Sequence, residues 1–234
     1  MCEDLSYIRA NIADVRKRIE TAAARSGRKA SDIRLVAVTK TIDAARIQVA
    51  VDEGIRDLGE NRVQELTEKY DKINRMCSWH MIGHLQTNKV KHIIDKACLI
   101  HSLDSAGLAH EIQKRAQKAG TIANVLVQVN VAEEKSKHGI FADEVFEFIR
   151  NISVLTNVKV RGLMTIAPFV DNAEEVRHVF RKLRKLYIDI KKTNIDNVDM
   201  DYLSMGMSND FEIAIEEGAN IVRIGTAIFG KRCR

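Results

Sequence analysis

The chain has 234 residues, of which 45% are hydrophobic and 29% are charged. This length and composition fit one globular domain with a sizeable core and exclude an extended disordered protein. The formal net charge of +5 predicts only mild attraction for anions, and no apolar run approaches the roughly 18 residues that a membrane helix needs.

The first half of the chain alternates between helical and strand patterns. Apolar residues spaced three and four apart from Leu5 to Ile19 predict an opening helix that ends near Gly27. The apolar run at 35–38 is typical of a strand buried on both faces, and it leads directly to Lys40. Further strands are expected at 55–58, 79–82, 97–100 and 124–131, and further helices at 43–53, 62–70, 88–95 and 108–119.

The second half continues this alternation. A long helix has an apolar face from Val176 to Ile190, and the only proline, Pro168, lies in the loop before it. The remaining elements are helices at 141–149 and 211–217 and strands at 158–163, 202–204 and 220–224. Eight short strands that alternate with helices predict an α/β protein, a (β/α)8 TIM barrel with an extra N-terminal helix, in a single domain over 1–234.

The long helix also carries a basic face, formed by Arg177, Arg181, Lys182, Arg184 and Lys185. Such a face, together with the sequence pI of about 9.0, could bind nucleic acid. No exposed aromatic residues are interleaved with these charges, which favours an ordinary solvated face. We therefore expect neither a nucleic-acid partner nor a membrane partner.

Neither the N-terminus nor the cysteines indicate export. The first residues are charged and amphipathic, and Glu3, Asp4 and Asp14 do not fit a cleaved targeting segment. No CxxC pair and no zinc-type spacing occurs among the four cysteines, Cys2, Cys77, Cys98 and Cys233. Reduced thiols, no bound metal and a cytoplasmic location are therefore expected.

Lys40 is the first candidate for chemistry, because α/β barrels carry their active sites at the carboxyl ends of the strands. A lysine whose amine faces an apolar pocket has its pKa lowered by desolvation and can form a Schiff base. A lysine at a strand end can also extend its ammonium group into water. The stretch around Lys40 leaves both interpretations open.

Two small polar loops follow the last two strands, at 204–210 and 223–226. Loops in these positions of a barrel often bind phosphate. Gly225 lets the backbone approach an anion, while Ser208 and Thr226 offer hydroxyls beside backbone N–H groups. Two ordinary turns would give the same pattern. Combined with a strand-end lysine, the loops indicate a phosphorylated aldehyde or ketone, and pyridoxal 5′-phosphate (PLP) fits both ends.

Arg223 stands two residues before Gly225, so strand alternation places both on the same side. Arg223 could therefore point inward below a pyridoxal ring and reach its pyridine nitrogen. Arginine cannot accept a proton, so it would favour an unprotonated ring, which is a weaker electron sink.

The sequence resembles the pyridoxal phosphate homeostasis protein family, the single-barrel relatives of alanine racemase. The resemblance runs over nearly the whole chain and implies a barrel like the alanine racemase N-terminal domain. It is carried by LVAVTK (35–40), GENRVQE (59–65), WHMIGHLQTNK (79–89), VRGLMTIAP (160–168), SMGMSNDFEIAIEEGA (204–219) and VRIGTAIFG (222–230).

The resemblance also implies roles for individual residues. Lys40 would hold PLP as a Schiff base, Arg223 would face the pyridine nitrogen, and Ser208, Gly225 and Thr226 would hold the phosphate. The family pattern places four more residues in segments that line the pocket: Asn61, His84, Met164 and Ser204. A hydrogen-bonded structural histidine is an equally good interpretation of His84.

The resemblance implies PLP binding and an influence on vitamin B6 vitamers and on amino and keto acids. Free amino acids and PLP-dependent apoenzymes are the further partners expected, and the protein is expected to be a monomer. Strong catalysis is not expected, because alanine racemase adds a β-rich domain and a tyrosine from a partner chain, and this sequence ends soon after its eighth strand. The alternatives are a weak PLP-dependent amino-acid racemase, a lysine aldolase without cofactor, and a nucleic-acid-binding module.

Overall fold

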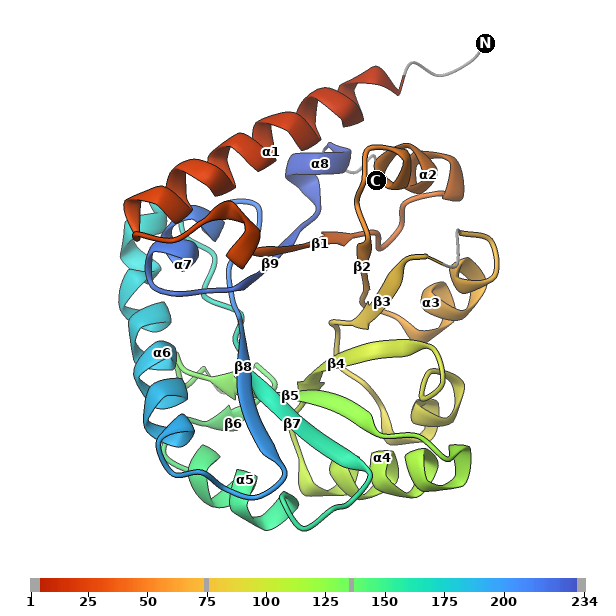
Figure 1. Ribbon diagram of the computed structural model, residues 1–234, viewed down its shortest axis with the longest axis vertical. Helices are drawn as coiled ribbons and strands as arrows, with labels where there is room; N and C mark the ends of the chain where they lie inside the picture. Colours follow the sequence, from red (N-terminus) through yellow and green to blue (C-terminus); the bar gives the residue numbers. More distant parts are fainter. Residues whose placement is uncertain (1–4, 74–75, 135–136, 231–234) are drawn as a thin grey trace.

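Eight parallel strands form a closed barrel at the centre of the structure, a computed structural model that describes residues 5–73, 76–134 and 137–230 (Figure 1). The order around the barrel is β4-β3-β2-β1-β9-β8-β7-β5, and pairing between β4 and β5 closes it. The barrel strands are β1 (Arg34–Val38), β2 (Asp57–Glu60), β3 (Ser78–Met81), β4 (Ala97–Leu103), β5 (Ala123–Asn130), β7 (Val158–Met164), β8 (Val198–Ser204) and β9 (Ile221–Ile224). A two-residue strand, β6 (Ile140–Phe141), pairs with β5 outside the barrel.

Helices surround the barrel, so the predicted (β/α)8 fold with an extra N-terminal helix is confirmed (Figure 1). That extra helix, α1 (Ser6–Arg25), packs against the second, seventh and eighth helices. The others are α2 (Ala44–Asp52), α3 (Val63–Tyr70), α4 (Ala106–Ala119), α5 (Val145–Ile152), α6 (Arg177–Lys191), α7 (Phe211–Glu216) and α8 (Thr226–Phe229). Three short 3-10 helices are η1 (Ala30–Asp32), η2 (Thr87–His92) and η3 (Ala173–Val176).

Strand alternation divides the apolar side chains into two clusters. In β1, Val36 points into the barrel, while Ala37 belongs to the large cluster between the strands and the helices. The interior cluster consists of Val36, Leu99, Leu126, Met164 and Ile221. Since both faces of each strand are buried, the strands have near-continuous apolar sequences, which is why the run at 35–38 was predictable.

Several predicted boundaries are wrong. The second strand spans Asp57–Glu60 rather than 55–58, because the N–H of Ile55 bonds to Ala50 O and completes the end of α2. The expected helix at 141–149 begins only at Val145, since Phe141 pairs with β5 as part of β6. Residues 88–95 form a 3-10 helix over Thr87–His92 followed by turns rather than a regular helix.

The fourth strand is longer than predicted, because polar residues interrupt its apolar pattern. It runs from Ala97 to Leu103 and includes His101 and Ser102, both fully buried. A strand whose inward side chains find polar partners inside a barrel does not show a continuous apolar run. Apolar patterning therefore underestimates strand length where the barrel interior is polar.

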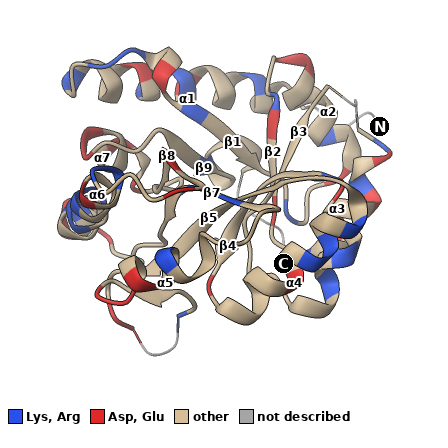
Figure 2. Cartoon of the chain, turned by 60° about the horizontal axis from the view of Figure 1, so that its bottom comes forward, with Lys and Arg blue, Asp and Glu red and all other residues tan. Residues whose placement is uncertain are grey.

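Three of the five basic residues on this face of α6, namely Arg177, Arg181 and Lys182, pair with carboxylates, and Figure 2 shows acidic residues of α7 beside basic residues of α6. Arg177 bonds to Glu216 and Glu217 at 2.7 and 2.9 Å, and Arg181 bonds to Glu217 at 2.9 Å. This pairing balances part of the positive charge that a polyanion would need.

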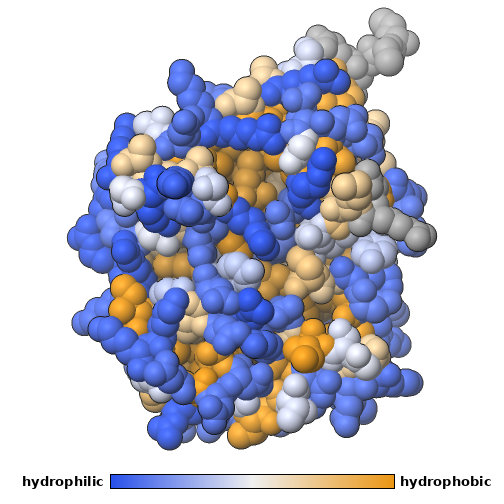
Figure 3. Space-filling model, viewed as in Figure 1, coloured by the Kyte–Doolittle hydropathy of each residue, from blue (hydrophilic) through white to orange (hydrophobic). Residues whose placement is uncertain are grey.

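The outer surface is mainly polar and the described cysteines are unpaired, as expected from the sequence. The face seen in Figure 3 is mainly hydrophilic, with apolar side chains scattered between charged ones. Within the described residues, no helix has the length and hydropathy needed to span a membrane. Cys77 and Cys98 are free thiols, whereas Cys2 and Cys233 lie outside the described part of the chain, as do Glu3 and Asp4.

Candidate functional site

Lys40 borders a cavity of about 200 Å³ at the carboxyl end of β1. Val38 on β1 and Arg223 on β9 also line it, and the segments that follow β7, β8 and β9 supply the other lining residues, including Ser208, Gly225 and Thr226. The structure therefore brings together the lysine, the arginine and the two polar loops that the sequence singled out. A larger cavity of about 950 Å³ lies at the amino end of the barrel and contains none of these residues.

An ion-pair network supports the two residues that flank Lys40. Lys69 Nζ on α3 donates to Thr39 O at 2.8 Å and pairs with Glu65 Oε2 at 3.0 Å. The same carboxylate oxygen accepts the backbone N–H of Thr41 at 2.6 Å, and Thr41 adopts a left-handed φ of 63°. These bonds fix the backbone on both sides of Lys40 and so determine where its side chain begins.

The predicted phosphate end contains backbone donors that converge on one hydroxyl. The N–H groups of Gly225 and Ala227 both donate to Ser208 Oγ, each at 3.3 Å. These are long hydrogen bonds, and an incoming anionic oxygen can make shorter, charge-assisted ones. A Cβ at position 225 would lie 3.3 Å from Val38 Cβ, so the loop packs tightly against β1. The pattern of donors and the lack of a side chain at 225 fit a phosphate group.

Arg223 is buried beside the cavity, with 4% of its surface exposed. Its Nη1 donates to Ser204 Oγ at 2.6 Å and its Nη2 to Thr165 O at 2.8 Å. Burial lowers the pKa of the guanidinium to about 10, although the nearby Asp210 carboxylate opposes this shift. Arg223 is therefore still cationic at neutral pH and places a fixed positive charge next to the cavity.

A chain of buried hydrogen bonds continues from Arg223 through the barrel interior. Ser204 Oγ lies 3.0 Å from His101 Nδ1, whose Nε2 lies 2.9 Å from His80 Nδ1. His80 Nε2 lies 2.9 Å from Asp57 Oδ1. With both imidazoles neutral, the four bonds run in one direction, from the guanidinium, which only donates, to the ionised carboxylate, which only accepts, and each histidine then carries its proton on Nε2.

The burial of His101 gives folding a specific pH dependence. Burial lowers the pKa of His101 well below 6.5, with further contributions from His80 and Arg223. Below about pH 6.5 the unfolded chain gains a proton that folded His101 does not, so stability falls as pH falls, by up to about 1.4 kcal/mol per pH unit. Urea unfolding of the wild type and His101→Gln at about pH 7.5 and 5.5 should show a smaller acid loss in the variant.

The exposed His178 provides the control for that experiment, and His178→Gln should leave the acid loss unchanged. The same acid loss in His101→Gln as in the wild type would contradict a buried neutral His101.

Four predicted site residues lie outside the lining of this cavity. Met164 belongs to the apolar cluster inside the barrel, and Ser204 is buried under Arg223. Asn61 follows β2 and His84 follows β3. These two segments pack closely, because a Cβ added to Gly83 would lie only 2.4 Å from Asn61 O. Contact of these four with a ligand stays a prediction.

The sequence also missed some residues of the site. Asp210 borders the cavity, and burial raises the pKa of its carboxyl group. Phe169, 83% exposed, follows Pro168 at the rim. Ala227 contributes only a backbone N–H group, so its residue type could not indicate a role in the site. Asp210 lies within the loop at 204–210 that the sequence already indicated, and that loop could have pointed to it.

Comparisons with known proteins extend over almost the entire chain. The family model for the N-terminal domain of alanine racemase matches residues 4–233. The pyridoxal phosphate homeostasis protein of Aquifex aeolicus (strain VF5) is 47% identical over 232 residues, which cover 99% of this chain and 98% of that protein. The structure of PipY from Synechococcus elongatus PCC7942 with PLP bound matches with a TM-score of 0.79 and 32% identity, covering 92% of this chain and 100% of PipY.

A more distant structure shares the fold. Alanine racemase of Clostridium difficile 630 matches with a TM-score of 0.70 at 17% identity. The match covers 98% of this chain but only 57% of the racemase, so the barrel corresponds to one part of that longer protein.

Proposed function

The chain belongs to the pyridoxal phosphate homeostasis protein family, and from that premise we propose that its cavity holds PLP on Lys40 as a Schiff base. The protein would thereby serve the homeostasis of vitamin B6 vitamers and of amino and keto acids. The observation that carries the proposal is the single cavity that combines Lys40, Arg223 and the donors around Ser208.

Each end of the cavity offers what one end of PLP requires. Lys40 supplies the amine for the aldehyde, and the apolar Val38 lines the same cavity. Ser208 and the N–H groups of Gly225 and Ala227 would hold the phosphate. Arg223 cannot accept a proton, so it would hold the ring nitrogen unprotonated. When bound, PLP supplies an aldehyde carbon that can exchange between the lysine and a free amine.

The direct test is an absorbance spectrum of the purified protein before and after addition of PLP. We expect a new visible band that saturates at one PLP per chain and is lost in Lys40→Ala. No band in the wild type, or the same band in Lys40→Ala, would contradict the proposal.

Removal of a hydroxyl from the phosphate end should weaken cofactor binding. A hydrogen bond to a charged group contributes about 1.5–3 kcal/mol, so Ser208→Ala and Thr226→Ala should each raise the Kd for PLP by about 10- to 100-fold. Gly225→Val should have a larger effect, because its side chain would collide with Val38. Fluorescence titration with PLP measures all three.

Ser31→Ala is the matched control, because Ser31 is exposed on η1, outside the cavity lining. Unchanged affinity in Thr226→Ala would remove that hydroxyl from the set of ligands. Unchanged affinity in Gly225→Val as well would contradict the phosphate assignment.

We further propose that the protein is a monomer that exchanges its cofactor with free amino acids and with PLP-dependent apoenzymes. Phe169, which lines the cavity, is exposed, so this rim of the cavity faces solvent, from which such partners would approach. Size-exclusion chromatography tests the monomer, and transfer of PLP to an apoenzyme, followed by the appearance of its activity, tests the exchange.

A further inference from the structure

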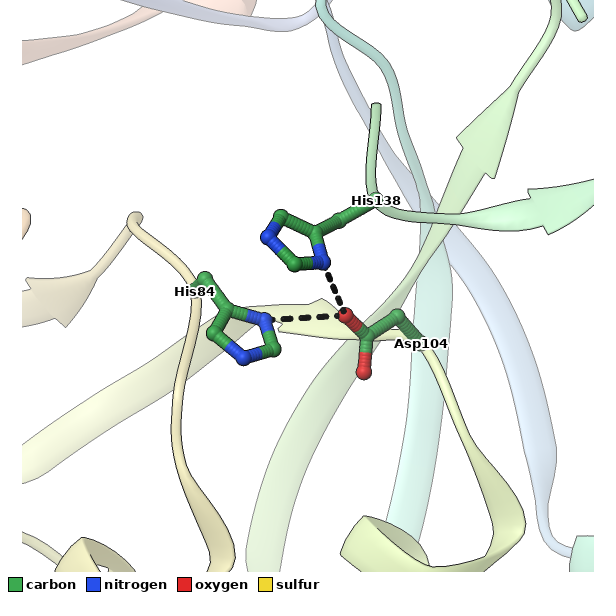
Figure 4. Close-up of side chains that lie close together, drawn as sticks. All are labelled: His84, Asp104 and His138. Atoms are coloured by element: carbon green, nitrogen blue, oxygen red, sulfur yellow. Dashed lines mark hydrogen bonds and ion pairs between the residues drawn. The ribbon is translucent and has the colours of Figure 1, made fainter. Parts of the chain in front are cut away.

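Two histidines and an aspartate gather at the carboxyl end of the barrel, outside the lining of the Lys40 cavity (Figure 4). His84 follows β3, Asp104 follows β4, and His138 stands two residues before β6, which pairs with the end of β5. The three residues therefore come from loops after three neighbouring barrel strands. The spacing of these three residues along the sequence fits no metal-binding motif, so the sequence alone does not indicate that they lie together.

The three side chains point their ligand atoms at one another. His84 Nδ1 lies 3.1 Å and His138 Nδ1 lies 3.8 Å from the same oxygen, Asp104 Oδ2. The two imidazole rings stack at 3.9 Å between centroids with an angle of 11° between their planes (Figure 4). Hydrogen bonding explains the contact at 3.1 Å but not the one at 3.8 Å, which is too long.

A metal ion accounts for both contacts. A tetrahedral ion with bonds of about 2.0–2.2 Å to nitrogen and oxygen holds its ligand atoms about 3.4 Å apart, between the two observed distances. The candidate ligand atoms all lie within 4.8 Å of one another. The exposed rings of His84 and His138 can rotate about Cβ–Cγ so that their lone pairs converge, whereas Asp104, 9% exposed, provides a fixed anionic base.

We propose that His84, Asp104 and His138 form a binding site for a divalent transition metal, with Zn²⁺ as the reference ion. Two imidazoles and one carboxylate suit Zn²⁺, Co²⁺ and Cu²⁺ better than Mg²⁺ or Ca²⁺, which prefer oxygen ligands alone. Three protein ligands leave one tetrahedral position open for water or an external donor. None of the three residues lines the Lys40 cavity, although the family resemblance also implies a place near the pocket for His84.

The experiment titrates untagged protein, loaded with PLP and freed of excess cofactor, with ZnCl₂ by calorimetry and with CoCl₂ by visible absorption. The wild type should bind one ion per chain, and Co²⁺ should give the intense visible bands of a tetrahedral site without thiolate charge-transfer bands. His84→Ala and His138→Ala should each weaken Zn²⁺ binding by at least about 10- to 100-fold. Loss of a residue that only supports a metal ligand already has an effect of this size, and loss of a ligand itself should cost no less.

His178→Ala, a change to an exposed histidine on α6, should leave the affinity unchanged. His138 is 60% exposed at its side chain, so its variant should fold even if a change at Asp104 does not. Absence of saturable binding in the wild type would overturn the proposal. Equal affinity in His84→Ala, His138→Ala and the wild type would do so as well, since the ion would then be bound elsewhere.

Discussion

Lys40→Ala should eliminate covalent retention of PLP. After borohydride reduction, peptide mass mapping of the wild type should find one reduced cofactor on the peptide that contains Lys40. Lys40 is the only lysine among the described residues that line the cavity, so no neighbouring amine can replace it. Residual PLP should still bind reversibly through the donors around Ser208, with the visible band of the attached cofactor absent.

Two further variants test whether retention depends on the amine of Lys40. One keeps a positive charge without a nucleophilic amine, and the other controls for nonspecific labelling of lysines. Lys40→Arg keeps a cation but offers no nucleophilic amine, so it should also lose covalent retention. Lys114→Ala removes an exposed lysine on α4 and should behave as the wild type. An adduct on another lysine with Lys40 unmodified would show that the attachment site is assigned incorrectly.

The features that the sequence predicted well depend on local patterns. The apolar run at 35–38 gives both the strand and the position of Lys40, since a strand buried on two faces needs such a run. Strand alternation puts Arg223 on the same side as Gly225, which predicts that it points inward, and in the structure Arg223 is buried and bonded to Ser204.

The features that the sequence missed depend on register between distant strands. His101, His80 and Asp57 meet only because β4, β3 and β2 pair in a particular register, and each looks like an ordinary polar residue in its own segment. The polar residues of β4 even made the strand look shorter than it is. Likewise, His84 and His138 are 54 positions apart in the numbering of the chain, and only closure of the barrel brings them together.

The wild-type protein should racemise alanine very slowly even when it is loaded with PLP. Racemisation requires one group to remove the α-proton and another to return a proton on the opposite face. Lys40 can serve one face. None of the four tyrosines borders the cavity: Tyr7 bonds to Phe229 O, Tyr187 bonds to Met200 O, Tyr202 borders the opposite cavity, and Tyr70 lies on α3 near Lys96.

The remaining acid near the cavity does not replace such a tyrosine. Asp210 Oδ1 already accepts the backbone N–H of Met207 at 2.6 Å, which fixes the carboxylate within its own loop. One positioned acid or base contributes about 10²- to 10⁴-fold to a rate, so the turnover should fall by at least that factor below the ordinary range of about 1–10³ per second. L-alanine and D-alanine are incubated separately with the protein in D₂O, and chiral chromatography coupled to mass spectrometry then measures both the opposite enantiomer and the α-deuterium.

A single base on one face removes and returns the proton from the same side. We therefore expect slow deuterium incorporation into only one enantiomer of alanine, the one whose α-proton faces Lys40, with little conversion into the other, and neither process in Lys40→Ala. Asp210→Asn serves as the check on the second face: if Asp210 delivers a proton there, this variant should lower conversion between the enantiomers without lowering deuterium exchange. Sustained formation of D-alanine at ordinary enzyme rates, dependent on Lys40, would make the protein a racemase and would contradict the carrier function.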